Sequence, residues 1–286
     1  MTARPDSTTQ NAPPAPGPAA AARTLLFVPG NRPERFAKAT ATAADLVILD
    51  LEDAVPEDSK TNARACVTQW LCADHPAAVR ISGTNSVHYH QDVRALAGLP
   101  GLRAVVVPMA DDPAALVSLC QRLGPDVEIV ALIETALGVV RAVELACTPG
   151  VSRLAFGHLD FAADIDSSIE DETMLMARSL LVVASRAAGL PGPVDGVTTA
   201  LDDPTVSAAD AARARGLGFA GKLCIHPSQV EGVNAAFSPS QERIAWARRI
   251  IEVSTAGGAS RVDGHMVDVP VILKARSILA RAKETA

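Results

Sequence analysis

Short apolar runs alternate along the chain with longer segments in which apolar residues recur at helical spacing. The apolar runs predict β-strands at residues 24–28, 46–50, 77–81, 104–108, 128–133, 153–157, 193–196 and 221–225. The segments between them predict helices at residues 33–44, 59–70, 89–97, 113–123, 136–146, 172–188 and 204–217. Apolar strands without polar alternation are typical of parallel sheets, and repeated strand–helix units predict an α/β protein with a TIM (β/α)8 barrel. An open, doubly wound sheet is the alternative, because periodicity does not show closure.

The two ends of the chain do not follow this alternation. Residues 1–22 are rich in proline and alanine and contain few bulky apolar side chains, so we expect a disordered tail. Residues 23–235 contain the predicted barrel. Two more helical patterns, at residues 240–254 and 270–283, follow the last strand. We therefore expect residues 236–286 to form a C-terminal helical extension, an arm that packs on the barrel or on a neighbouring subunit.

Composition narrows the class of protein. A length of 286 residues suits one barrel, and 48% hydrophobic residues with only 3% aromatic residues predict an aliphatic core. Lys and Arg number 26 against 32 Asp and Glu, a net charge of −6 that argues against a nucleic-acid partner. No stretch is long and apolar enough for a membrane span, and the tail lacks the apolar segment of a secretion signal. Because the five cysteines are scattered, we expect a cytoplasmic protein without disulfides.

Ionic side chains stand where several apolar runs end, and α/β barrels place their catalytic groups at such positions. Glu134 follows the run at 128–133, and Asp160 follows the run at 153–157. On successive strands these two carboxylates would be neighbours, and two carboxylates with waters and substrate oxygens can hold Mg²⁺. The alternative is that each acid caps the following helix or lies in its first turn.

Arg80 ends a third run, where a guanidinium group can bind a carboxylate or an enolate oxygen through two parallel hydrogen bonds. Three acids, Asp50, Glu52 and Asp53, end the run before it. A buried salt bridge between Arg80 and these acids is the alternative, and both interpretations can hold together. Acids that do not pair with Arg80 could orient metal-bound water.

Two other features predict structure rather than chemistry. Residues 216–221 match G-x-G-x-x-G, but they follow a predicted helix and open a predicted strand. A dinucleotide-binding loop needs the opposite order, so these glycines indicate a helix end and a tight turn. His226 ends the last run, and because no nucleophile is apparent beside it, a structural role at the turn is favoured.

Motifs along most of the chain resemble the citrate lyase β-subunit-like branch of the HpcH/HpaI aldolase/citrate lyase family. They are LFVPGN (26–31), ILDLEDAV (48–55), VRI (79–81), LIETA (132–136), FGxxDF (156–161), GKxxIHPSQ (221–229) and MVDxP (266–270). They occur in the family's order with suitable gaps, from about Arg23 to about Ala282. The motifs are specific to the family but not to a substrate.

This resemblance implies an enzyme, a Mg²⁺-dependent carbon–carbon lyase on a TIM barrel. Its reaction would cleave or form a 3-hydroxyacyl-CoA such as malyl-CoA or citramalyl-CoA, leaving an enolate of the acyl thioester that needs a fixed cation. Two alternatives remain: an aldolase acting on free 2-oxo acids, and a carrier-dependent citrate lyase β subunit. The resemblance also implies a homo-oligomer, a trimer or hexamer. The hydroxyacyl group and the physiological direction stay open.

The resemblance assigns roles at the mouth of the barrel by motif position. Glu134 and Asp160 are expected to bind Mg²⁺, with Glu134 also at the substrate. Arg80 is expected to bind the substrate and its enolate. Glu52 and Asp53 are expected to take part in catalysis by contacting the groups that bind metal and substrate, without binding either themselves.

The resemblance also assigns residues outside the mouth. Asp268 is expected to act as the acid and base from a neighbouring subunit, and Arg35 and Lys38 are expected to contact CoA. Glu34 occupies a position that is basic in the CoA-binding helix of relatives. For Asp268 the alternative is a helix cap, since Pro270 lies in the first turn of the helix that follows.

Overall fold

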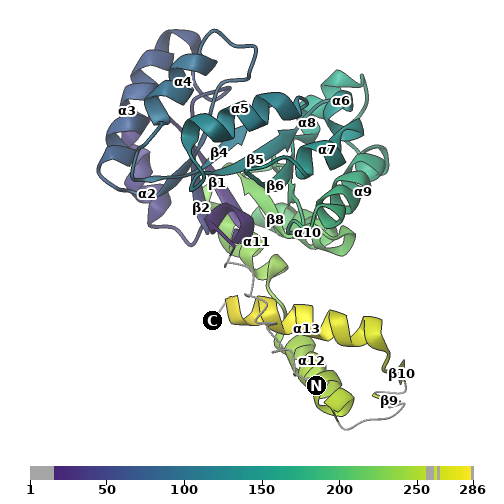
Figure 1. The fold of residues 1–286 in the computed structure, drawn as a ribbon. Helices are drawn as coiled ribbons and strands as arrows, with labels where there is room; N and C mark the ends of the chain where they lie inside the picture. Colours follow the sequence, from purple (N-terminus) through teal and green to yellow (C-terminus); the bar gives the residue numbers. More distant parts are fainter. Residues whose placement is uncertain (1–15, 256–260, 263–264, 285–286) are drawn as a thin grey trace, which may run out of the picture.

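The computed structural model describes residues 16–255, 261–262 and 265–284, and its centre is a closed parallel barrel (Figure 1). Each strand pairs in parallel with the next, and β8 pairs with β1. The strands are β1 Thr24–Pro29, β2 Leu46–Asp50, β3 Ala77–Arg80, β4 Leu102–Val107, β5 Glu128–Ile133, β6 Val151–Phe156, β7 Val194–Asp195 and β8 Gly221–Cys224. The predicted TIM barrel is confirmed, and closure excludes the open sheet.

Helices surround the barrel and connect its strands. They are α2 Phe36–Thr40, α3 Lys60–Cys72, α4 Tyr89–Leu96, α5 Pro113–Leu123, α6 Ala136–Val140, α7 Ala142–Ala146, α8 His158–Asp164, α9 Asp171–Ala187, α10 Pro204–Leu217 and α11 Val230–Phe237, with 3-10 turns η1 Pro33–Arg35, η2 Glu57–Ser59 and η3 Pro227–Gln229. The helix predicted at 136–146 is divided at Arg141, after a segment with a glycine and two valines, which favour helix weakly. The sequence did not predict α8, because its seven residues are too few to show a helical period.

The aliphatic core has two layers separated by the sheet. One apolar cluster fills the inside of the barrel and includes Leu25, Ile48 and Val130. The other lies between strands and helices and includes Leu26 and Leu49. Because successive residues of a strand face opposite sides, a strand buried on both sides must be apolar throughout. This explains the runs without polar alternation.

The structure differs from the predicted tail at residues 16–22. Here α1, Pro18–Ala21, lies at the N-terminal end of the barrel, with Ala19 and Ala20 buried. Their N–H groups donate to the carboxylate of Glu128, at 2.8 and 3.0 Å. Their carbonyl oxygens accept from Nη1 of Arg153, both at 3.0 Å. The small side chains let this turn sit close to the barrel, where a negative and a positive group bind its two ends. Residues 1–15 lie outside the described residues.

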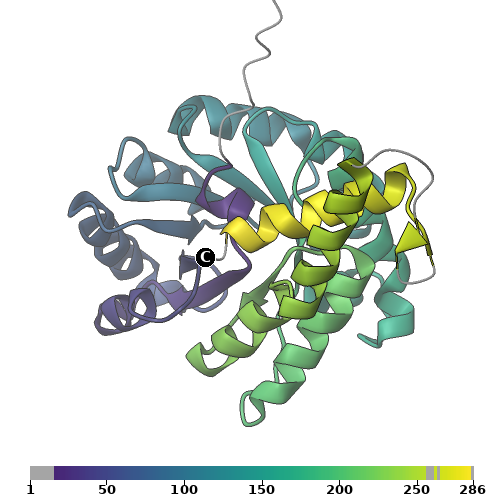
Figure 2. The same ribbon diagram turned by 90° about the horizontal axis from the view of Figure 1, so that it is seen from below.

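The arm consists of α12 Gln241–Thr255 and α13 Val269–Glu284, joined through the short strands β9 Arg261–Val262 and β10 His265–Met266. A separate apolar cluster that includes Ile250 and Ile278 holds the two helices together. Figure 1 shows the arm beyond one end of the barrel, and Figure 2, seen from below, shows it across the end where α1 lies. The helices therefore follow the barrel where the sequence predicted them.

The two features that the sequence assigned to turns have structural roles. Gly218 follows α10 in the left-handed region, with a φ of 113°, and its N–H caps the helix. A side chain there would be strained and would also meet Val182. Nδ1 of His226 accepts a hydrogen bond from the N–H of Ser228 at 3.2 Å and so caps η3.

Two further findings concern membrane spans and disulfides. Among the described residues, no helix is long and apolar enough to cross a membrane. The cysteines, at positions 66, 72, 120, 147 and 224, are all free thiols.

Candidate active site

The C-terminal ends of the strands surround a cavity of about 290 Å³, the mouth cavity. Ionic groups at the ends of β2, β3 and β5 and on α8 line this cavity together with mostly apolar residues. The lining residues are Phe27, Asp50, Asp53, Ala54, Arg80, Leu132, Glu134, Gly157, His158, Leu159, Asp160, Val197, Thr199, Leu223 and Ile225. The structure therefore brings Arg80, Glu134 and Asp160 to one cavity.

Arg80 is held by a two-point contact with Asp50, which is fully buried at the end of β2. Nε lies 2.7 Å from Oδ1 and Nη2 lies 2.6 Å from Oδ2 of this carboxylate. Nη1 faces the other acids, 3.0 Å from Glu52 and 3.4 Å from Asp53. The guanidinium carbon also lies 4.8 Å from the ring centroid of Phe27. Arg80 therefore forms the predicted salt bridge and also lies at the mouth of the barrel.

These contacts fix the charge of Arg80 as well as its position. Burial lowers the pKa of Arg80, but the hydrogen bonds and charge of Asp50, with the charges of Glu52 and Asp53, raise it above its ordinary value. The group stays cationic at any working pH. Burial raises the pKa of Glu52 to about 7, although the charge of Arg80 opposes this. Asp53 lines the cavity, whereas Glu52 lies against Arg80 without lining it.

Glu134 is a buried carboxylate, with 4% of its surface exposed. Its Oε2 accepts a hydrogen bond from the N–H of Met109 at 2.9 Å. Burial raises the pKa of Glu134 to about 8; the Met109 N–H opposes this, and the charge of Asp160 adds to it. Gly157 leaves room for this side chain, because a Cβ there would overlap the Glu134 carboxylate. The surroundings of Glu134 thus disfavour its negative charge.

The helix-capping alternative applies to one of the two acids. Thr135, not Glu134, caps α6, through a hydrogen bond from the N–H of Gly138 at 2.9 Å. Asp160 lies in the first turn of α8. An acid in that position is favourable to a helix whatever else it binds.

The two carboxylates fit a magnesium ion. A buried acid whose pKa is raised partly by a second acid marks a place where a cation would relieve an excess of negative charge. Among the described residues, no group of three or more His, Cys, Asp and Glu side chains forms a complete metal cage. An ion bound by Glu134 and Asp160 would take its remaining ligands from water and substrate, as Mg²⁺ commonly does.

Asp268 does not line the mouth cavity within one subunit. Its Oδ1 accepts a hydrogen bond from the N–H of Val271 at 3.1 Å, at the start of α13. This is the contact that the helix-cap alternative predicts. The arm lies at the opposite end of the barrel (Figure 1), so a role at the mouth requires a second subunit and stays a prediction.

Arg35 and Lys38 follow β1 on η1 and α2, and both are exposed. The nearby acid Glu34 is bound by Arg32, with Nε and Oε1 2.7 Å apart, and lies 4.0 Å from Arg35. Its charge is therefore matched locally, and the surface keeps a positive balance from Arg35 and Lys38. Their contact with CoA stays a prediction.

Sequence reasoning missed a buried ionic cluster beneath the mouth. Arg178 donates to Asp195 at 3.0 Å, and Nζ of Lys222 donates to the carbonyl oxygen of Gly196 at 2.6 Å. His158 lines the cavity above them, and burial lowers its pKa to about 4. These residues come from α8, α9, β7 and β8, far apart in the sequence. The one available signal was Lys222, a lysine inside an apolar strand.

A closed parallel barrel whose mouth holds a buried arginine and two acids, Glu134 and Asp160, that form no ion pair with another described residue defines a class of TIM-barrel enzyme suited to metal-assisted chemistry on oxyanions. The family model of the HpcH/HpaI aldolase/citrate lyase family matches residues 23–227. The chain belongs to this family of carbon–carbon lyases.

Known relatives cover nearly the whole chain. A citrate lyase subunit beta-like protein of Deinococcus radiodurans is 35% identical, over 92% of this chain and 98% of its own length. A (3S)-malyl-CoA thioesterase of Cereibacter sphaeroides is 36% identical, over 92% and 95%. The crystal structure of CitE from Mycobacterium tuberculosis in complex with magnesium, acetoacetate and coenzyme A is 36% identical, with a TM-score of 0.81 over 92% of this chain and 99% of that chain.

Proposed function

We propose that the protein is a Mg²⁺-dependent carbon–carbon lyase that cleaves or forms a 3-hydroxyacyl-CoA such as malyl-CoA or citramalyl-CoA. The observation that carries this proposal is the mouth cavity, where Glu134 and Asp160 share a wall with Arg80. The CitE complex with magnesium, acetoacetate and coenzyme A supports it, since that relative binds all three kinds of ligand.

The chain's own residues account for the charges of such a reaction. Mg²⁺, when bound by Glu134 and Asp160, would supply Lewis-acid stabilisation at the substrate's oxygen atoms. A base takes the proton of the 3-hydroxyl group, which becomes the carbonyl of the released 2-oxo acid, and the electron pair of the broken C–C bond leaves the acyl thioester as its enolate. Arg80, already fixed by Asp50, stabilises the enolate oxygen without reorganising. An acid must then protonate the enolate carbon.

That acid is Asp268 of a neighbouring subunit in this proposal, because Asp268 does not line the mouth cavity of its own barrel and α13, which follows it, lies beyond the other end of the barrel (Figure 1). Large apolar side chains on α6 and α9 support a homo-oligomer: Val140 is 81% exposed, Met176 68% and Val183 62%. Surfaces of this kind mark protein–protein contacts. The same proposal includes an assembly that is a trimer or a hexamer. It also includes a cytoplasmic location.

Mixing two inactive variants tests the shared site. Arg80→Ala and Asp268→Ala, combined under subunit exchange, should regain part of the activity, because some mouths then receive an intact barrel and an intact arm. No recovery in demonstrated mixed oligomers would refute the role in trans. Full activity of Asp268→Ala alone would reduce this residue to a helix cap.

A panel of substrates tests the activity itself. Purified protein with Mg²⁺ should release acetyl-CoA or propionyl-CoA from the matching 3-hydroxyacyl-CoA. Turnover of free 2-oxo acids alone would favour the aldolase, and turnover only with a substrate on a carrier protein would favour a citrate lyase β subunit. Release of free CoA would indicate thioester hydrolysis, the activity named for the Cereibacter relatives.

The contact with CoA has its own test. Arg35→Gln with Lys38→Gln should raise the KM for the CoA ester and leave kcat nearly unchanged, because both side chains lie on the surface after β1 rather than in the mouth. An unchanged KM would remove these residues from the CoA site.

A further inference from the structure

His158, the first residue of α8, lines the mouth cavity with ring nitrogens that are unused within the described chain. The residue is 8% exposed, and its buried Nδ1 has no hydrogen-bond partner among the described residues. Nε2 makes no hydrogen bond to a described residue either. No other described residue of this cavity wall has a buried side-chain nitrogen or oxygen atom without a partner. A polar group of this kind is costly unless it gains a partner, and in a cavity wall the partner can be a ligand.

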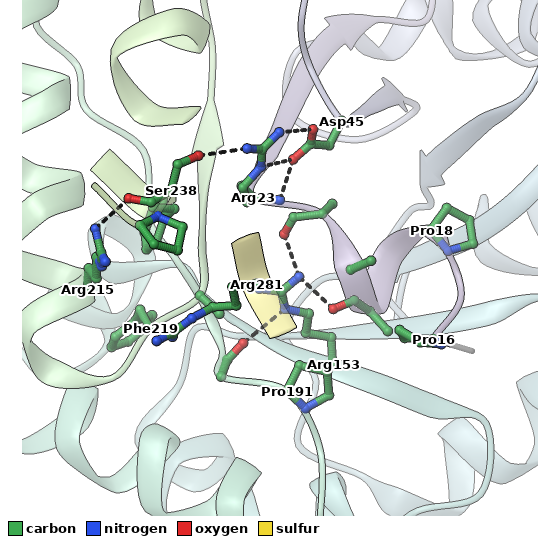
Figure 3. A pocket seen from close by; sticks show the side chains of 17 residues that line it. Pro16, Pro18, Arg23, Asp45, Arg153, Pro191, Arg215, Phe219, Ser238 and Arg281 are labelled. Atoms are coloured by element: carbon green, nitrogen blue, oxygen red, sulfur yellow. Dashed lines mark hydrogen bonds and ion pairs between the residues drawn. The ribbon is translucent and has the colours of Figure 1, made fainter. Parts of the chain in front are cut away.

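A buried polar side chain at the other end of the barrel shows the usual arrangement. A second cavity, of about 450 Å³, lies there beside α1 and α13 (Figure 3). Arg153 in its wall is 1% exposed. It donates from Nε to the carbonyl oxygen of Gly192 at 3.0 Å, and from Nη1 to those of Ala19 and Ala20, both at 3.0 Å. Arg153 therefore finds its acceptors within the protein, whereas His158 does not.

The ring of His158 is held in place by the backbone at Gly196, the residue after β7. A Cβ at position 196 would overlap Nδ1 and Cε1 of the ring. The carbonyl oxygen of Gly196 accepts from Nζ of Lys222 at 2.6 Å, and the ring of Phe156 lies 6.2 Å from that of His158, between centroids. Nδ1 meets no acceptor at this edge, and a buried N–H without an acceptor is rarer than a lone pair without a donor. The proton of the neutral ring therefore belongs on Nε2.

The mouth cavity is rich in acceptors and poor in free donors. Four of its lining side chains are carboxylates, those of Asp50, Asp53, Glu134 and Asp160. Arg80 already directs its guanidinium group at three acids. Among the described residues of the wall, Thr199 and His158 are the other side chains that carry a hydrogen-bond donor. Thr199 is exposed, so His158 is the buried and fixed donor of the two.

We propose that His158 determines which acyl group binds, by donating a hydrogen bond from Nε2 to the carboxylate of the substrate's 3-hydroxyacyl group. This inference rests on the proposed function, in which Glu134 and Asp160 hold Mg²⁺ in the same cavity. A carboxylate that contacts the metal keeps lone pairs for a further donor. Because a hydrogen bond to a carboxylate is stronger than one to a neutral oxygen, His158 favours 3-hydroxyacyl groups that carry a carboxylate at C3.

The test is calorimetric binding of glyoxylate and pyruvate to the full-length protein with saturating Mg²⁺. Malyl-CoA and citramalyl-CoA would release these 2-oxo acids, which keep the carboxylate in question. His158→Phe retains a flat ring without nitrogen atoms and should weaken binding about tenfold or more, as the loss of a charged hydrogen bond does. His158→Gln should lose less, because its amide nitrogen can replace Nε2. His90→Phe, at an exposed position of α4, removes an imidazole elsewhere and should bind like the parent.

Mg²⁺ without a 2-oxo acid should bind equally to the parent and to His158→Phe, because His158 holds the substrate and not the metal. Circular dichroism shows whether each variant is folded; if His158→Phe is not, His158→Leu replaces it. The proposal is overturned if the apolar variant binds both 2-oxo acids like His90→Phe, if His158→Gln loses as much, or if the affinity for Mg²⁺ alone falls in parallel. Absence of binding to the parent also overturns it, and the lyase proposal fails as well only if no CoA ester is cleaved.

Discussion

The substitution Glu134→Gln should inactivate the enzyme and yet stabilise the metal-free protein at alkaline pH. Glu134 is buried, and its pKa is raised to about 8 in the folded protein. In the unfolded chain the carboxyl group titrates near pH 4.3. Glutamine keeps an oxygen for the N–H of Met109 and removes the charge.

The size and the pH range follow from the two pKa values. The folded state holds the proton of Glu134 more tightly than the unfolded chain does. Below the unfolded pKa the carboxyl group therefore does not lower the free energy of unfolding. Between about pH 4.5 and 8 its ionisation lowers this free energy progressively, and above pH 8 the loss is constant. At about 1.4 kcal/mol per pH unit, the cost approaches roughly 5 kcal/mol as an upper value. We expect Glu134→Gln to raise the free energy of unfolding by roughly 2–5 kcal/mol at pH 8.5, a rise in Tm of at least about 4 °C.

The assay is urea and thermal unfolding of the parent and Glu134→Gln in EDTA between pH 4.5 and 9, repeated with Mg²⁺. The advantage of the variant should vanish at the acidic end. Mg²⁺ should stabilise the parent, by about 2.7 kcal/mol at a hundredfold excess over its Kd, and leave the variant unchanged. A difference that does not depend on pH, or equal stabilisation of both proteins by Mg²⁺, would refute the reasoning.

Three more predictions concern single residues. Arg80→Lys keeps the charge and loses the two-point contact with Asp50, so kcat should fall about 10²-fold in steady-state assays; a change in KM alone would mean that Arg80 binds only the ground state. Gly157→Ala should displace the Glu134 side chain and weaken the binding of Mg²⁺ at least about tenfold, measured by titrating activity with the metal; an unchanged titration would contradict this position of Glu134. Arg153→Gln should lower the free energy of unfolding by roughly 2–4 kcal/mol in urea, because buried carbonyl oxygens of α1 lose their donor; a loss under about 0.5 kcal/mol would show that α1 is held otherwise.

The barrel could be predicted from sequence because each strand carries its own signal, an aliphatic run buried on both faces. The same runs located the mouth, since parallel strands bring their C-terminal ends to one side. Arg80, Glu134 and Asp160 line one cavity for this reason. What stayed hidden depends on contacts between distant segments: α1 is held by residues more than a hundred positions away.

The role of Asp268 shows another limit of sequence reasoning. The same aspartate fits the start of a helix and an acid that completes a neighbour's site, and the two interpretations predict the same motif. The structure shows the capping hydrogen bond to Val271. The other role involves a second chain, so it depends on the experiment with mixed subunits.

The unequal numbers of acids and bases at the mouth have a consequence for the order in which ligands add. Arg80 forms ion pairs with Asp50, Glu52 and Asp53. Among the described residues that line the mouth it is the one arginine or lysine, beside the four acids Asp50, Asp53, Glu134 and Asp160. A substrate that carries its own carboxylate is repelled by this metal-free mouth. Magnesium should therefore add first and the organic substrate second, as an ordered kinetic sequence, and the substrate's measured affinity should rise with the occupancy of the cation.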